Sequence, residues 1–187
     1  MNSNAREAIL LAATRIAQSQ GYNGLNYRDL AQAVGIKAAS IYYHFPSKAD
    51  LGVEVARRYW QDGAAALEAL SAESTGPAAA LQRFPQIFRR SLEAENRLCL
   101  GSFLGAETDN LPSELTREIQ AFAEVNIQWL QRQLAAARIG PVEQHEARAR
   151  AIFAAVAGAQ LLARSRSDIG LFDSLIETYR MCGPLLD

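Results

Sequence analysis

The stretch GYNGLNYRDLAQAVGIKAASIYYHFPSKADL, residues 21–51, decides how this chain folds. Within it, the side chain of Asn26 can accept hydrogen bonds at the start of a helix from residue 27 to about residue 34. Gly35 can adopt the left-handed conformation that ends such a helix. A second short helix is expected over residues 38–44. Two short helices joined by a tight glycine turn form a helix–turn–helix pattern.

Four consecutive rings, at residues 42–45, close this pattern, and they cannot all face one core. Neighbouring residues of a helix are about 100° apart around its axis. On a helical wheel Tyr43 points away from the protein, Tyr42 flanks it on one side, and Lys37 and His44 flank it on the other. The inner face comprises Ala38, Ile41 and Phe45, which we expect to pack on Leu30, Ala31 and Val34.

The outer face of this second helix suits the major groove of DNA. Serine can bond to either base edge, and alanine methyl groups can meet thymine methyl groups. Tyrosine hydroxyls, a histidine and a lysine at the start of the next helix suit phosphates on either side. Ser47 and Asp50 are expected to cap that next helix. The candidate DNA-binding residues are Lys37, Ala39, Ser40, Tyr42, Tyr43, His44 and Lys48.

At these positions the chain resembles the TetR family of transcriptional regulators. A helix–turn–helix alone is a weak match, but a set of matches at the family's spacing over about thirty residues is specific. The matching residues are Gly21, Tyr22, Leu30, Ala31, Val34, Gly35, Ile36, Tyr42, Phe45, Lys48 and Leu51.

The resemblance implies a DNA-binding domain at residues 4–64 and a ligand-binding and dimerisation domain at residues 65–187. Regulators of this family usually repress by occupying operator DNA and leave it when a ligand binds. Carried over by position, residues 38–44 are the recognition helix, and Tyr42 and Lys48 contact phosphates.

Four positions depart from the family pattern. The family often has Ser or Thr where Lys37 stands, and a long polar residue near Ala38. It often has Gly or a Thr-like residue near Ala39, and Asn26 replaces the usual Thr. The two alanines leave open which residues read the bases, and Lys37 can compensate by reaching a phosphate.

The rest of the chain also has helical periodicity, and no segment has a convincing period of two. We therefore predict an all-α protein of about nine helices. Pro85 should kink one of them or mark its real start. Besides the two short helices, the expected helices are residues 5–20, 48–70, 78–95, 114–138, 143–164 and 169–181, with a short one in CLGSFLGAE, residues 99–107.

Composition excludes several classes of protein. Apolar residues make up 49% of the 187, charged residues 21%, and the net charge is −1, which argues against disorder. Residues 1–50 carry five Lys and Arg against three Asp and Glu, a net +2, which fits local anion binding. We see no signal peptide and no apolar run of about 18 residues, so we expect a cytoplasmic protein.

The sequence has no obvious catalytic or metal-binding site. His44 and His145 are the only histidines, and no Cys/His cluster has zinc spacing. No glycine-rich phosphate loop is present. An enzyme that used Cys99 as its nucleophile would have no histidine placed as a base. We therefore expect no enzyme activity, no metal and no cofactor.

The C-terminal part is rich in apolar and aromatic side chains, most of which should form the core. A ligand pocket of the family's kind would be lined by such residues with a few polar groups, which favours a small apolar or aromatic ligand. Asn126, Gln128 and Glu107 are candidate polar partners. The candidate pocket residues are Tyr59, Phe88, Cys99, Phe103, Phe122, Asn126 and Trp129.

Cys99 allows a second hypothesis, that of a thiol switch. Asn96 can cap the helix that follows and so place Cys99 in its first turn, with Arg97 two residues away. Both features lower the pKa of a thiol and favour the reactive thiolate. The alternative is a small buried core residue, and for Cys182 a structural role is favoured.

Small residues in IFAAVAGAQLLAR, residues 152–164, favour close approach of two helices across a two-fold axis. The candidate dimer interface comprises Ala154, Ala157, Gly158, Leu161, Phe172, Ile176 and Tyr179.

The sequence as a whole indicates a one-component DNA-binding regulator. The favoured form is a homodimeric repressor, released from a quasi-palindromic double-stranded operator by a small molecule. One alternative is a regulator that responds to electrophiles or oxidants through Cys99. A more remote one is a helical protein–protein adaptor, which would leave Tyr43 and Lys48 without a role.

Overall fold

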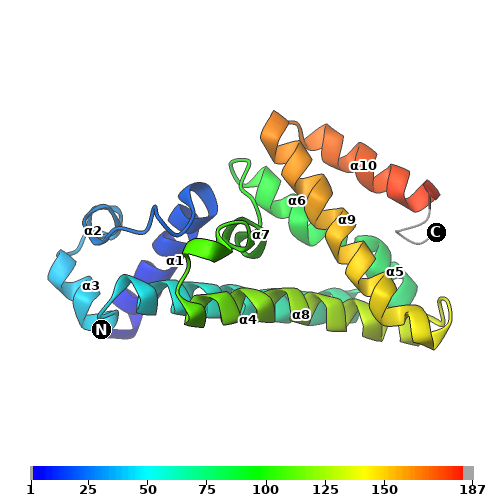
Figure 1. Ribbon diagram of the computed structural model, residues 1–187, viewed down its shortest axis with the longest axis horizontal. Helices are drawn as coiled ribbons and strands as arrows, with labels where there is room; N and C mark the ends of the chain where they lie inside the picture. The colour runs from blue at the N-terminus through cyan, green and yellow to red at the C-terminus, as the bar shows by residue number, and fades with distance from the viewer. Residues whose placement is uncertain (1, 183–187) are drawn as a thin grey trace. The chain divides into compact units, whose positions relative to one another are not determined.

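The computed structural model describes residues 2–182, and within them the chain is helical, with no strand (Figure 1). The predicted all-α class is confirmed. The helices are α1 (Asn2–Gln20), α2 (Tyr27–Val34), α3 (Ala38–His44), α4 (Lys48–Glu73), α5 (Pro77–Arg83), α6 (Pro85–Glu93), α7 (Leu100–Gly105), α8 (Ser113–Ala137), α9 (His145–Arg166) and α10 (Ile169–Cys182), with short 3₁₀ turns η1 (Thr108–Asn110) and η2 (Val142–Gln144).

The local signals that delimit the helix–turn–helix are found where they were expected. The Asn26 side chain accepts hydrogen bonds from two backbone N–H groups in the first turn of α2, and Gly35 ends that helix with φ of 74°. At the start of α4, the N–H of Asp50 donates to Ser47 Oγ over 3.1 Å, and the N–H of Ser47 donates to an Asp50 carboxylate oxygen over 3.0 Å. The predicted helix boundaries at both ends of the helix–turn–helix are confirmed.

Pro85 divides the helix predicted for residues 78–95 into α5 and α6. Proline has no N–H to continue the hydrogen-bond ladder, and its ring clashes with the preceding turn. The N–H of Phe84 instead bonds to the Leu81 carbonyl over 3.2 Å, which closes α5 with a tighter turn. The single predicted helix is therefore two, and the second begins at the proline.

The chain forms two compact units. The first comprises the residues up to Gln61 together with Leu100–Phe122, and the second comprises Asp62–Cys99 together with the residues from Ala123 on. The helices α4 and α8 are each continuous across a unit boundary in the sequence. The predicted functional domains at residues 4–64 and 65–187 stay a prediction, and residues 183–187 lie outside the described part of the chain.

The core of the first unit holds the helix–turn–helix together. Helices α1, α2 and α3 pack against one another (Figure 1). As predicted, Ile41 of α3 and Phe45, the residue after α3, are buried in the same cluster as Leu30 and Ala31 of α2. The same cluster contains Leu100, Leu104 and Leu115, which come from far along the sequence. The N-terminal helices therefore complete their core with a segment that sequence periodicity could not assign to them.

A carboxylate of α8 fastens this segment to α4 within the first unit. Glu118 accepts two hydrogen bonds from the Arg57 guanidinium, over 2.7 and 3.1 Å, on one oxygen. Its other oxygen accepts the indole N–H of Trp60 over 2.8 Å. Both oxygens of Glu118 are thus bonded to the same face of α4.

The second unit is centred on aromatic side chains and on a buried amide. Trp129 is fully buried, stacks on Phe84 with ring centroids 5.7 Å apart, and donates its indole N–H to Ser71 Oγ over 3.0 Å. Gln160 of α9, also fully buried, donates to the Phe88 carbonyl over 2.6 Å. Helices α6 and α10 both pack on α9 (Figure 1).

One buried hydrogen bond links the two ends of the helix–turn–helix. The hydroxyl of Tyr27, the first residue of α2, donates to the carbonyl of Phe45, the residue after α3, over 2.8 Å. Burial raises the pKa of this hydroxyl to about 12, and the nearby Asp50 carboxylate adds to the effect. The bond therefore fixes the C-terminal end of α3 to the start of α2.

Replacing Tyr27 with Phe should lower the free energy of unfolding by about 1 kcal/mol, because a buried carbonyl loses its donor. Urea denaturation at pH 7 measures this difference. The wild type should then lose its advantage as the pH rises from about 10 towards 12, because only the unfolded tyrosine ionises readily in that window. Equal stability of the two proteins at pH 7 would contradict the assignment.

Candidate DNA-binding surface

Helix α3 presents two tyrosines to solvent. Tyr43 is 72% exposed and Tyr42 is 56% exposed. Ile41, on the inner face of the same helix, is fully buried. The predicted orientation of Tyr43, away from the protein, is confirmed. Ala39 is exposed and Ser40 is half-buried. This face of the short helix is therefore largely open to solvent.

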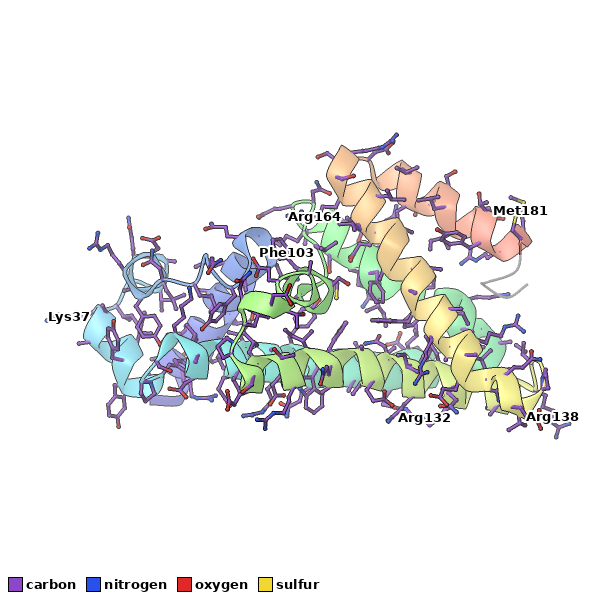
Figure 2. The ribbon with its side chains drawn as sticks, viewed as in Figure 1. Lys37, Phe103, Arg132, Arg138, Arg164 and Met181 are labelled. Atoms are coloured by element: carbon purple, nitrogen blue, oxygen red, sulfur yellow. The ribbon has the colours of Figure 1, made fainter. Side chains whose placement is uncertain are left out.

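The residue that precedes α3 is Lys37, whose side chain is exposed (Figure 2). Its backbone is extended, with φ of −79° and ψ of 144°, and its carbonyl accepts the N–H of Ser40 over 2.9 Å. Its side chain makes no capping hydrogen bond to the helix. The ammonium group is thus carried at the N-terminal end of α3, as the sequence predicted.

Two of the predicted phosphate-binding residues also pack on the protein. The Tyr42 ring lies 4.6 Å from the Tyr27 ring, centroid to centroid, so one of its faces is covered while more than half of the side chain stays exposed. His44 is half-buried, and its ring meets Tyr43 edge-on with centroids 5.2 Å apart. Packing of this kind fixes ring orientation and leaves the polar tip available.

Lys48, the first residue of α4, rests on the turn that follows α1. Its ammonium nitrogen lies 4.5 Å from the centroid of the Tyr22 ring and donates to the Asn23 carbonyl over 3.3 Å. An ammonium group has three donors. The lysine predicted to contact phosphate is therefore held in position by the protein before any DNA is bound.

A groove of about 610 Å³ adjoins the C-terminal end of α3, within the first unit. Its charges are largely paired, since Glu54 binds both Arg6 and Arg57, and Arg57 also binds Glu118. Sequence reasoning missed this groove because its walls come from helices far apart in the chain. The lining residues are Arg6, His44, Phe45, Pro46, Ala49, Asp50, Val53, Glu54, Arg57, Glu114, Arg117 and Glu118.

The residues predicted to line a ligand pocket fall into two groups. Tyr59, Phe103 and Phe122 belong to the first unit, where the Tyr59 and Phe122 rings lie 5.6 Å apart. Phe103 is on α7 (Figure 2) and is half-buried. The second unit holds Phe88, Cys99, Asn126 and Trp129, all of them buried.

The polar partners proposed for that pocket have other contacts. Glu107 accepts the backbone N–H of Tyr22 over 2.8 Å, within the first unit. Gln128 is exposed and donates to Glu124 over 2.7 Å. Asn126 is 3% exposed, and of the three it is the one buried amide.

The prediction that Asn96 caps α7 is wrong. Asn96 has a left-handed backbone with φ of 53°, and its side chain donates to the Arg164 carbonyl over 3.0 Å. Cys99 lies before the helix, and its own N–H donates to Gln160 Oε1 over 3.0 Å. The thiol is buried, at 3% exposure, and Arg97 pairs with Glu95. The cap on which the thiolate hypothesis rested is absent, and the side chain is packed as a core residue.

The predicted interface residues on α9 and α10 differ in exposure. Leu161 is 53% exposed, Ala154 is exposed, and open space surrounds the position of a Cβ on Gly158. Phe172 and Ile176 are instead buried within the second unit, at 1% and 4% exposure. Ala157 and Tyr179 are half-buried. The exposed part of the predicted set therefore lies on α9.

Within residues 2–182, no group of three His, Cys, Asp or Glu side chains is placed to hold a metal ion. None of the helices in this range is long and apolar enough to span a membrane.

A packed helix–turn–helix core with an open second helix is the arrangement of a DNA-binding regulator. Comparison with known proteins agrees. The model of bacterial regulatory proteins of the tetR family matches residues 9–55. A solved structure of a TetR transcriptional regulator from Legionella pneumophila is 32% identical, with a TM-score of 0.87, and covers 94% of this chain and 95% of that one. The chain belongs to the TetR family of transcriptional regulators.

Two named regulators show how far the likeness extends. The HTH-type transcriptional regulator RutR of Escherichia coli (strain K12) is 26% identical over 148 residues, which is 76% of this chain and 68% of RutR. The HTH-type transcriptional regulator LmrA of Bacillus subtilis (strain 168) is 44% identical over 52 residues, which is 27% of this chain and only 28% of LmrA. The chain is a DNA-binding transcriptional regulator and not an enzyme, as its family shows.

The two cysteines should differ in reactivity, because Cys99 is buried and Cys182 is exposed. Treatment of the folded protein with a stoichiometric maleimide, followed by peptide mass spectrometry, should label Cys182 first. Cys99 should become labelled only in urea, and a Cys182→Ser variant provides the background. Rapid labelling of Cys99 in the folded protein would restore the thiol-switch hypothesis.

Proposed function

We propose that this chain is a repressor that binds a quasi-palindromic operator as a homodimer in the cytoplasm and is released from it by a small apolar or aromatic molecule. The observation that carries the DNA-binding part is the exposed face of α3, since Tyr43 is 72% exposed on a helix whose other face is buried. Tyr42, which is 56% exposed, is next to it, and adjoining exposed aromatic side chains mark an interaction surface more often than a single scattered apolar residue does.

The predicted contact residues divide by chemistry into two kinds. Ala39, Ser40 and Tyr43 have the size and polarity to meet base edges in the major groove. The ammonium groups of Lys37 and Lys48, with Tyr42 and His44, suit the phosphates on either side. In this scheme the first group sets operator sequence and the second sets affinity and its dependence on salt.

The proposed release mechanism uses the continuity of the long helices. Helix α4 starts at Lys48, beside the recognition helix, and runs on into the second unit. A ligand that favours another arrangement of the second unit would change the separation of the two recognition helices of a dimer. Operator affinity can fall by no more than the ratio of the ligand's affinities for the two arrangements.

Binding of the purified protein to its own upstream DNA tests the main proposal. Tyr43→Ala should weaken specific binding by about tenfold or more, equivalent to roughly 1.4 kcal/mol. Fluorescence anisotropy at two salt concentrations measures it. Val142→Ala, which shortens a 75% exposed apolar side chain of the second unit, is the matched control. Wild-type affinity of Tyr43→Ala would exclude a groove contact for this ring.

The proposed dimer has a separate test on α9. Leu161→Glu should convert the dimer to a monomer, because a charge would be buried in an apolar contact. Analytical ultracentrifugation measures the mass. Leu11→Glu changes a leucine of the same 53% exposure on α1 and should leave the dimer intact. An unchanged dimer with Leu161→Glu would place the interface on another face.

A further inference from the structure

The turn after α1 is held by a side chain from the segment that follows α7. Gly21 ends α1 with a left-handed φ of 69°. The next residue, Tyr22, donates its backbone N–H to a carboxylate oxygen of Glu107 over 2.8 Å. A Cβ placed on Gly21 would lie 2.4 Å from the other oxygen. The carboxylate therefore lies directly against the glycine, and both the backbone angle and the space require glycine there.

Glu107 is itself well fixed. Its N–H bonds to the Leu104 carbonyl over 3.0 Å, and its carbonyl accepts the N–H of Asn110 over 2.9 Å, so its backbone joins α7 to η1. Leu100 and Leu104 anchor α7 in the core of the first unit. The backbone that carries the Glu107 carboxylate is thus held in place by these bonds and by the packing of α7.

The Tyr22 ring packs against α4 and so connects the turn to this helix. A Cβ on Gly52 would lie 2.9 Å from the ring, so the tyrosine packs directly on the backbone of α4. Burial of this kind raises the pKa of the Tyr22 hydroxyl. One turn earlier on the same helix, the Lys48 ammonium lies 4.5 Å above the ring and donates to the Asn23 carbonyl. The turn of residues 21–23 therefore holds this ammonium group in place.

We infer that Glu107 is a positioning residue for DNA binding, which holds the Tyr22 turn so that the Lys48 ammonium stands ready for a DNA phosphate. The inference rests on the proposed phosphate contact of Lys48. Glu107 touches no DNA in this scheme and acts only through the turn.

The direction in which DNA affinity changes when Glu107 is replaced separates a positioning role from a simple effect of charge. Removing a carboxylate near a phosphate-binding lysine should strengthen DNA binding if only charge matters, because a repulsion is lost. Positioning makes the opposite prediction when the hydrogen-bond acceptor is removed. Glu107→Gln removes the charge and keeps an acceptor oxygen, whereas Glu107→Met is of similar length and removes both.

The first experiment measures operator affinity between 50 and 200 mM salt. Over this range, the loss of about one phosphate contact gives a measurable change in the slope of log K against log salt. Glu107→Met should bind about three- to tenfold more weakly and lose about 0.9 from the slope of log K against log salt, as Lys48→Met should. Glu107→Gln should bind at least as well as the wild type. The double variant Glu107→Met/Lys48→Met should be no weaker than Lys48→Met alone.

The second experiment needs no DNA. The ring current of Tyr22 should shift the ε-methylene protons of Lys48 upfield in the NMR spectrum, and this shift should collapse in Glu107→Met but persist in Glu107→Gln. Should Glu107→Met fail to fold, as judged by circular dichroism, Glu107→Asp replaces it, because its shorter side chain reaches less far towards Tyr22.

The two experiments separate the possible failures. An unchanged Lys48 shift in Glu107→Met, or DNA binding as tight as that of the wild type, would overturn the positioning role. A Lys48→Met variant with the wild-type salt slope would instead refute the phosphate contact in the proposed function, while the NMR result still decides what Glu107 does.

Discussion

The burial of Ile41 and Phe45 is the constraint on which the DNA-binding surface depends. Helix α3 has seven residues, and a helix this short is not stable in water without tertiary contacts. Ile41 of this helix and Phe45, the residue after it, enter the core of the first unit, and the carbonyl of Phe45 is bonded to the Tyr27 hydroxyl. Because these contacts use only the inner face, the outer face is left open at Tyr43 and Ala39.

The same core explains why residues 100–122 belong with the N-terminal helices. Three leucines of this segment complete the apolar cluster, and Glu118 bonds to both Arg57 and Trp60 of α4. Glu107 occupies the space that Gly21 leaves free. The core that supports α3 is thus built from two stretches of the chain, which are separated in sequence by about forty residues of the other unit.

The buried polar groups of the second unit give that unit a defined structure. Gln160 is fully buried and bonds both to the Phe88 carbonyl and to the N–H of Cys99. Leaving either group unpaired in the interior would cost free energy, so the amide ties α9, α6 and the segment before α7 into one arrangement. The cysteine is in this network through its backbone, which accounts for its burial without a role for the thiol.

The helix–turn–helix and the direction of its side chains could be predicted from the sequence alone. Caps at Asn26, Gly35 and Ser47 act within a few residues, and helical periodicity separates Ile41 from Tyr43 in a single turn. Local rules of this kind are readable in one chain. They also identified Pro85 as a break, although not that it makes two helices.

The contacts between residues far apart in the sequence could not be predicted in this way and are known from the three-dimensional structure. Periodicity does not show that Glu107 lies against Gly21, that Glu118 bonds to α4, or that Asn96 turns away from α7 to reach α9. It also could not separate Phe172 and Ile176, which are buried, from Leu161, which is exposed. These outcomes depend on long-range packing, because a side chain's partner is set by the whole core and not by its neighbours in sequence.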